Sequence, residues 1–359
     1  MVAIPSVPRR VAVEDGDRSA RARTVMAGLV ALVAAASVMS LATGAAGVSL
    51  WQALAVLARG EALGLREQVV LFDIRLPRLA LGLMVGAALA VGGAVMQGLF
   101  RNPLADPGLV GVGAGAGLGA VVAIVLGGLL PAGLAAATGI YTVPMAAFLG
   151  GWATTLLLYR VSTRAGRTSV ATMLLAGIAL GALAGALTGI LVYIADDRQL
   201  RDLTFWGLGS LAGANWTKVL TAAPIILTAL LAAPFLARAL NGLALGESAA
   251  AHMGVPVQRA KNLAILTVAG ATGAAVAVSG GIGFIGIVVP HLLRLGIGPD
   301  HRFLLPAAAL LGAALLVLSD ILARTIIAPA ELPIGIVTAV LGAPVFLWIL
   351  LRRRGVVDL

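Results

Sequence analysis

The stretch from Leu79 to Met96 reads LALGLMVGAALAVGGAVM and contains no charged residue. A helix of about 17 to 25 such residues, rising 1.5 Å per residue, crosses the roughly 30 Å hydrocarbon core of a bilayer. A transmembrane β-strand instead alternates apolar and polar residues over about ten positions. This stretch does not alternate, so it predicts a membrane-spanning α-helix.

Apolar stretches of similar length recur along the chain, and about ten of them are long enough to span a bilayer. They begin near Val25, Leu79, Leu109, Val143, Val170, Val219, Leu263, Ile282, Leu304 and Leu332. The composition agrees, because 60% of the 359 residues are hydrophobic and only 11% are charged, with a mean hydropathy of +1.05. We therefore expect an all-α integral membrane protein with about ten transmembrane helices.

The net charge of +10 is spread over short loops rather than gathered on one polar face, so it does not indicate nucleic-acid binding. With about ten helices, the side that holds both termini receives seventeen of the 25 Lys and Arg residues. The positive-inside rule then places both termini in the cytoplasm. We expect residues 1–24 to form an Arg-rich cytoplasmic tail near anionic lipid headgroups, and residues 25–359 to form one polytopic domain. The first apolar stretch is interpreted as a retained helix, because no small-residue cleavage site follows it.

Several residue types that enzymes need are missing from the chain. It contains no cysteine, which excludes disulfides, iron-sulfur clusters and thiol nucleophiles. Neither Lys218 nor Lys261 follows the Gly-rich turn of a phosphate-binding loop, so any ATP must be hydrolysed by another polypeptide. His252, His291 and His301 have no second ligand or partner acid at metal or triad spacing. We expect no catalytic residue, metal site or cofactor on this chain.

An ion-coupled secondary transporter is the alternative class of function. Such carriers bury acidic residues midway along their helices, where a charge costs roughly 2.5 to 3.5 kcal/mol. The nearest acid of this kind, Asp320, lies close to a helix end and is spaced to pair with Arg324. The distribution of charge therefore favours a transporter that takes its energy from another subunit.

The two halves of the chain show a weak internal similarity. The segment Gly86–Gly93 matches Gly273–Gly280, and the same offset carries Pro103 onto Pro290. The two segments run in opposite directions in the predicted topology, as inverted repeats of transporters do. The pattern predicts an inverted repeat of helices 2–5 and 7–10, with chance similarity between Gly/Ala-rich helices as the alternative.

Short motifs in a fixed order carry a family resemblance. They are Ile74-Arg75-Leu76-Pro77-Arg78, Gly86–Ala90, Gly92–Gln97, Asn102–Leu109, Leu245-Gly246-Glu247, Gly283–Gly286, Val289-Pro290-His291, Gly298–Arg302 and Ala330–Gly335. Through them the chain, from about residue 70 to 351, resembles the permease family of ATP-driven importers of iron-siderophores, haem and cobalamin. The resemblance implies a homodimer in a bacterial inner membrane with a passage between its subunits. It also implies two cytoplasmic ATPase subunits that bind the ATP, and a periplasmic substrate-binding protein.

The resemblance also bears on the passage and the substrate. It implies that helices five and ten line the passage, here about residues 170–194 and 332–351. The segments that look more like haem and siderophore members than cobalamin members are Thr204–Trp206, Gly209–Leu211, Ala323–Thr325 and Ala328–Glu331. We expect haem as the substrate, with a ferric siderophore or cobalamin as alternatives. No His or Tyr stands at an obvious position for an axial ligand of haem iron.

A coupling segment for the ATPase is expected at residues 245–254. It lies between Arg238 and Arg259 on the basic side, and its first three residues match the family's coupling motif. Glycines at both ends permit sharp turns, and a glutamate is favourable at a helix N-terminus. The residues expected to serve ATPase coupling are Leu245, Gly246, Glu247, Ala250, Ala251 and Gly254. An ordinary amphipathic connector is the alternative.

The cytoplasmic mouth of the passage is expected at residues 102–108. Two prolines there break helical hydrogen bonding, and an asparagine can satisfy the freed backbone groups. The mouth residues are Asn102, Pro103, Leu104, Ser169 and Val170. Ser169-Val170 stands where cobalamin members have a Ser-Thr pair, which makes gating by that pair doubtful.

Arg75, Arg78 and Arg324 are expected to dock the periplasmic binding protein. They lie on the side that is otherwise poor in positive charge, beside helix ends where their side chains are expected to reach water. The resemblance implies the same role, because these positions match arginines that meet acidic residues of the binding protein in cobalamin-type relatives. The alternative is that they anchor helix ends at the membrane surface, with Arg324 neutralising Asp320.

Overall fold

The computed structural model describes residues 18–44, 46–164 and 167–352. Its elements are α1 (Ser19–Ala42), α2 (Leu50–Ala58), α3 (Leu65–Gln68), the π-helical η1 (Val69–Arg75), α4 (Leu76–Phe100), η2 (Pro107–Val110), α5 (Val112–Leu126), η3 (Gly127–Leu129), α6 (Ala132–Thr138), η4 (Gly139–Tyr141), α7 (Thr142–Ser162), β1 (Thr163–Arg164), β2 (Arg167–Thr168), α8 (Val170–Ile194), α9 (Asp197–Leu208), α10 (Trp216–Ala232), η5 (Ala233–Leu236), α11 (Ala237–Ala244), α12 (Glu247–His252), α13 (Val257–Ser279), α14 (Ile285–Ile297), α15 (His301–Thr325) and α16 (Ile334–Arg352). The two strands form a short antiparallel hairpin. The fold is all-helical, as predicted.

Within the described residues, eight helical stretches are long and apolar enough to cross a membrane, and two shorter apolar helices lie at Ile285–Ile297 and Ile334–Trp348. Together they match the expected ten stretches. The short helix α14 has a local cause: Gly280 and Phe284 adopt positive φ angles of 72° and 69°, so the helix cannot begin before Ile285. It therefore starts slightly after the predicted Ile282.

Three helix starts differ clearly from the prediction, and one of them is α13, which begins at Val257 rather than near Leu263. The second spanning helix was expected near Leu79, but α3, η1 and α4 form one continuous stretch from Leu65 to Phe100. Its 36 residues measure about 54 Å, which is longer than the hydrocarbon core. The charged residues that end the hydropathy signal therefore lie inside the helix. The first helix begins at Ser19 rather than Val25, and most of the predicted tail lies outside the described residues.

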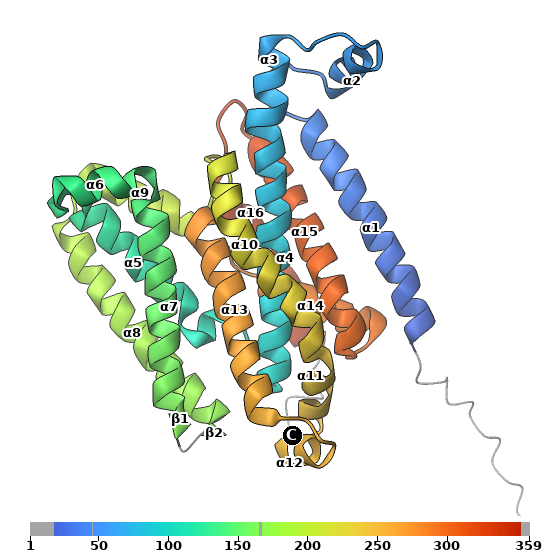
Figure 1. Cartoon of the computed structure of the whole chain (residues 1–359), viewed down its shortest axis with the longest axis vertical. Helices are drawn as coiled ribbons and strands as arrows, with labels where there is room; N and C mark the ends of the chain where they lie inside the picture. The colour runs from blue at the N-terminus through green and yellow to red at the C-terminus, as the bar shows by residue number, and fades with distance from the viewer. Residues whose placement is uncertain (1–17, 45, 165–166, 353–359) are drawn as a thin grey trace, which may run out of the picture.

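The helices pack as two groups (Figure 1). In one, α4 contacts α10, α13, α14 and α15, and α1 packs on α15; in the other, α5, α7 and α8 contact one another. Figure 1 also shows the two ends of the bundle. The start of α1, the β1–β2 hairpin and α12 lie at one end, which we name the α12 end, and α2, α3 and α9 lie at the other, the α2 end.

Glycines set the closest helix contacts. A Cβ atom on Gly93 would overlap the Gly286 carbonyl of α14, and one on Gly86 would overlap the Gly312 carbonyl of α15. Small residues of this kind let helix backbones approach in lipid, where no hydrophobic drive holds helices together. The antiparallel helices α4 and α13, which carry the predicted repeat, are the most buried parts of the bundle. The repeat itself stays a prediction.

Candidate functional site

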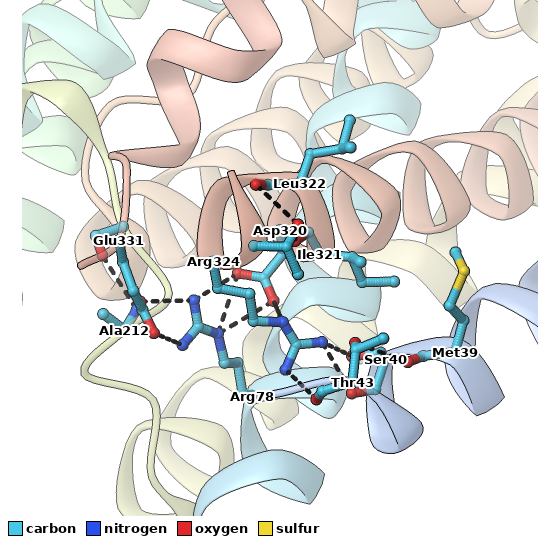
Figure 2. A network of polar contacts seen from close by, with 12 residues as sticks. Met39, Ser40, Thr43, Arg78, Ala212, Asp320, Ile321, Leu322, Arg324 and Glu331 are labelled. Carbon is cyan, nitrogen blue, oxygen red and sulfur yellow. Dashed lines mark hydrogen bonds and ion pairs between the residues drawn. The ribbon is translucent and has the colours of Figure 1, made fainter. Parts of the chain in front are cut away.

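An ionic cluster lies at the α2 end, where α4 meets α15 (Figure 2). The Arg78 guanidinium donates to both oxygens of Asp320, with Nε at 3.0 and 3.1 Å and Nη2 at 2.9 Å. It also donates through Nη1 and Nη2 to the two oxygens of Glu331, each at 2.9 Å. The planar fork of arginine suits such paired contacts. Arg78 thus joins α4 to α15 and to the connection that follows α15.

The other two arginines fix the end of α1 to this cluster. Arg324 lies one turn after Asp320, with its Nε 3.6 Å from a carboxylate oxygen, and its Nη2 donates to the carbonyl and the hydroxyl of Ser40, both at 2.8 Å. Arg75 donates to the Leu41 carbonyl. These contacts satisfy carbonyls at the C-terminus of α1, which no helical bond can reach. We name Arg75, Arg78, Asp320, Arg324 and Glu331 the Arg78 network.

The expected exposure of the three arginines is wrong. Arg75 is 3% exposed, and Arg78 and Arg324 are each 8% exposed. Instead of reaching water, Arg78 donates to two carboxylates, and Arg75 and Arg324 donate to carbonyls at the end of α1. The predicted pairing of Asp320 with Arg324 is present, but Arg78 is the closer partner of that carboxylate. Docking of a binding protein by these arginines stays a prediction.

Sequence reasoning missed the role of Glu331. Its side chain is 35% exposed, which makes it the most accessible charged partner of Arg78. The sequence did contain a signal for this role, because Glu331 belongs to the Ala330–Gly335 motif, which was expected on the same side of the membrane as the three arginines. Glu331 and Arg78 are 253 residues apart in the chain, so spacing alone does not pair them.

The predicted coupling segment contains a short helix at the α12 end. Gly246 and Gly254 have φ angles of 106° and 77°, so the chain turns sharply before and after α12. Ala250 is fully buried, whereas the neighbouring Ala251 is exposed. Glu247 begins the helix, and its carboxylate lies 2.7 Å from the Lys261 ammonium of α13. The contact of this segment with an ATPase stays a prediction.

The predicted mouth is a turn that follows α4. Asn102 accepts a hydrogen bond from the Leu104 amide at 2.9 Å, as expected of an asparagine beside proline. Asp106 accepts one from the Gly108 amide at 2.7 Å. Burial raises the pKa of the Asp106 carboxyl, and the bond from Gly108 opposes that rise. The next helical turn, η2, contacts α8, so this segment meets the helix expected to line the passage.

The other half of the predicted mouth is the beginning of α8. Ser169 is the N-cap, and its hydroxyl accepts a hydrogen bond from the Thr172 amide at 3.2 Å. Leu104 is exposed and Val170 is half-buried. Both segments lie at the α12 end (Figure 1). Their gating role stays a prediction.

Comparison with known proteins identifies a common family. The model of the FecCD transport family matches residues 30–352. The chain is 51% identical to the hemin transport system permease protein HmuU of Yersinia pestis, over 79% of this chain and 83% of that one. It is 43% identical to the vitamin B12 import system permease protein BtuC of Salmonella typhi, over 82% and 88%.

A solved structure supports the same assignment. A metal-chelate type ABC transporter in an inward-facing conformation superposes with a TM-score of 0.80 at 34% identity, over 92% of this chain and 99% of that one. Permeases of this family work with ATPase subunits and a substrate-binding protein, and they are not enzymes themselves. With its spanning helices and its match over nearly the whole described region, the chain belongs to the FecCD transport family and is a membrane-spanning permease of an ABC importer.

Proposed function

We propose that this permease imports haem. The observation that carries the proposal is the 51% identity to a hemin permease, against 43% and 44% to cobalamin permeases over similar lengths. The test is ATP-dependent uptake by vesicles that contain the permease, its ATPase and its binding protein. Haem, a ferric siderophore and cobalamin are supplied separately, and uptake without ATP is the control. Uptake of cobalamin or siderophore but not of haem contradicts the proposal.

The working unit that we propose is a homodimer whose passage is lined by α8 and α16. On α8, Leu175, Ile178 and Ile190 expose 70%, 64% and 61% of their surface, and on α16 Val340 exposes 65%. These exposed apolar faces on the two helices support a contact with a second copy of the chain and with a large apolar substrate in the passage. Cross-linking of single cysteines along α8 tests the arrangement, since the chain contains no cysteine of its own.

Tyr193, near the α2 end of α8, is a candidate substrate contact that sequence reasoning overlooked. Its side chain is 91% exposed, so its phenol is available to a substrate entering the passage. Tyrosine is a known axial ligand of haem iron. Tyr193→Phe is therefore expected to lower haem uptake. Uptake of a substrate whose metal has no free coordination position should stay the same. Equal haem uptake by the two forms argues against this contact.

We propose that the α12 end faces the cytoplasm and receives the ATPase subunits, and that the α2 end faces the binding protein. The basic residues Arg101, Arg160, Arg164 and Arg238 lie at or near the ends of helices that reach the α12 end, in accord with the positive-inside rule. Labelling of single cysteines from outside the cell tests the orientation. A cysteine at Trp51 should react, and one at Ala251 should be protected until the membrane is made permeable.

A further inference from the structure

Lys261 is a buried cation that joins two separate segments at the α12 end. It lies on the second turn of α13 and is 3% exposed. Its Nζ donates to a Glu247 oxygen at 2.7 Å and to the Thr168 carbonyl at 2.8 Å. One ammonium group therefore connects the first residue of α12 with the last residue of β2.

Thr168 is held by further bonds to the same helix. Its amide donates to Gln258 Oε1 at 2.9 Å, and its hydroxyl accepts from Gln258 Nε2 at 2.7 Å. Its side chain is buried. The next residue, Ser169, caps α8. Thr168 is therefore joined directly to the beginning of α8.

The α12 side of the connection is less constrained. Gly246 and Gly254 turn the chain on either side of the helix, and the Glu247 side chain is 45% exposed. Within the described region, Lys261 is the cation paired with Glu247. If α12 moves, the hydrogen bond that Lys261 donates to Glu247 moves the lysine, which also donates to the Thr168 carbonyl.

We propose that Lys261 is a positioning residue that transmits movement of α12 to the beginning of α8. The proposal rests on the proposed function, in which the ATPase contacts α12 and α8 lines the passage. Lysine suits this place, because its ammonium is a compact charge with three donors and can bond to a carboxylate and a carbonyl together. The alternative is that the Lys261–Glu247 pair only anchors α12. In that case, breaking the pair loosens α12, but α8 still moves when ATP binds.

The test measures movement of α8 in the complete complex. Ala171, exposed on the first turn of α8, is changed to cysteine and spin-labelled in both subunits, and their separation is measured by double electron–electron resonance with and without ATP. Lys261→Met and Glu247→Gln should each lower the population of the ATP-dependent distance roughly tenfold or more, because the first removes both hydrogen bonds of the ammonium and the second removes the negative charge from its partner. The ATP hydrolysed per substrate imported should rise. The matched control is Arg259→Ala, an exposed basic residue on the same helix, which should behave as the unmodified chain does.

The outcomes separate this inference from the proposed function. If the unmodified complex shows no ATP-dependent change in distance, the coupling of the ATPase to α8 is refuted, and the role of Lys261 with it. If the unmodified complex changes and both variants change equally, the role of Lys261 alone is refuted. If Lys261→Met fails to fold, Glu247→Gln decides the question, since it keeps the lysine and its bond to Thr168.

Discussion

Replacing Asp320 with Asn isolates the charge that holds the Arg78 network together. The carboxylate is buried, accepts three hydrogen bonds from Arg78 and lies 3.6 Å from Arg324. Asparagine keeps the size and one acceptor oxygen, but it removes the charge and turns an amide donor toward guanidinium donors. Arg78 then keeps the Glu331 carboxylate, and Arg324 loses its carboxylate partner.

The expected cost follows from burial. Breaking a buried ion pair by removing one partner destabilises a protein by about 3 to 5 kcal/mol. Because Glu331 still compensates Arg78, we expect the lower end, about 3 kcal/mol. At the average unfolding entropy per residue, this loss lowers the melting temperature of a chain of this size by about 4 °C. Glu331→Gln should cost about 1 kcal/mol or less, since Glu331 is partly exposed and Asp320 remains.

The assay is loss of the monodisperse peak of purified permease after heating, without any partner present. Glu61→Gln serves as the control for an exposed pair, because Arg59 and Glu61 are 61% and 58% exposed, and it should leave the melting temperature unchanged. We expect the melting temperature to be lowest for Asp320→Asn, intermediate for Glu331→Gln and highest for Glu61→Gln. Equal melting temperatures for the first two variants refute the view that the buried carboxylate is the centre of the network.

Three further predictions concern docking, packing and coupling. Glu331→Gln should raise the association rate of the binding protein severalfold at low salt and less at high salt, because it removes a carboxylate that competes for Arg78; an unchanged rate argues against docking at this arginine. Gly93→Ala should cost about 1 to 3 kcal/mol or more in thermal unfolding, since its methyl group overlaps a backbone carbonyl, whereas Gly28→Ala, with open space around it, should melt as the unmodified chain does. Ala251→Trp should weaken ATPase binding and uptake at least tenfold without changing the melting temperature, because this side chain points outward; unchanged ATPase binding contradicts the coupling role.

The spanning helices were predictable because lipid imposes them. A backbone in hydrocarbon must satisfy its own hydrogen bonds, so long apolar runs become helices whatever their neighbours are. The short helix at Glu247–His252 was predictable for a local reason, since Gly246 and Gly254 permit turns at its two ends. The turn at Asn102 was predictable from the prolines beside it.

Long-range pairing was not predictable in the same way. A hydropathy window ends at Arg75 and Arg78, yet the helix continues upstream to Leu65. Distant carboxylates neutralise Arg78, and a carbonyl of α1 accepts a hydrogen bond from Arg75. Glu331 and Lys261 were overlooked as functional residues for the same reason. Each bonds to a residue that is distant in the sequence, and the periodicity of hydrophobic residues does not predict such contacts.

The composition of the Arg78 network also sets when it can form. Arg78 and Asp320 are separated by 242 residues, and chains grow at about 5 to 20 residues per second, so Arg78 exists for roughly 10 to 50 s before its partner is made. During that interval its guanidinium must remain in contact with water or lipid headgroups at the membrane surface. The nascent permease thus carries an uncompensated charge on its central helix through most of its synthesis. The Arg78 network can form only after α15, one of the last helices, has been synthesised and inserted.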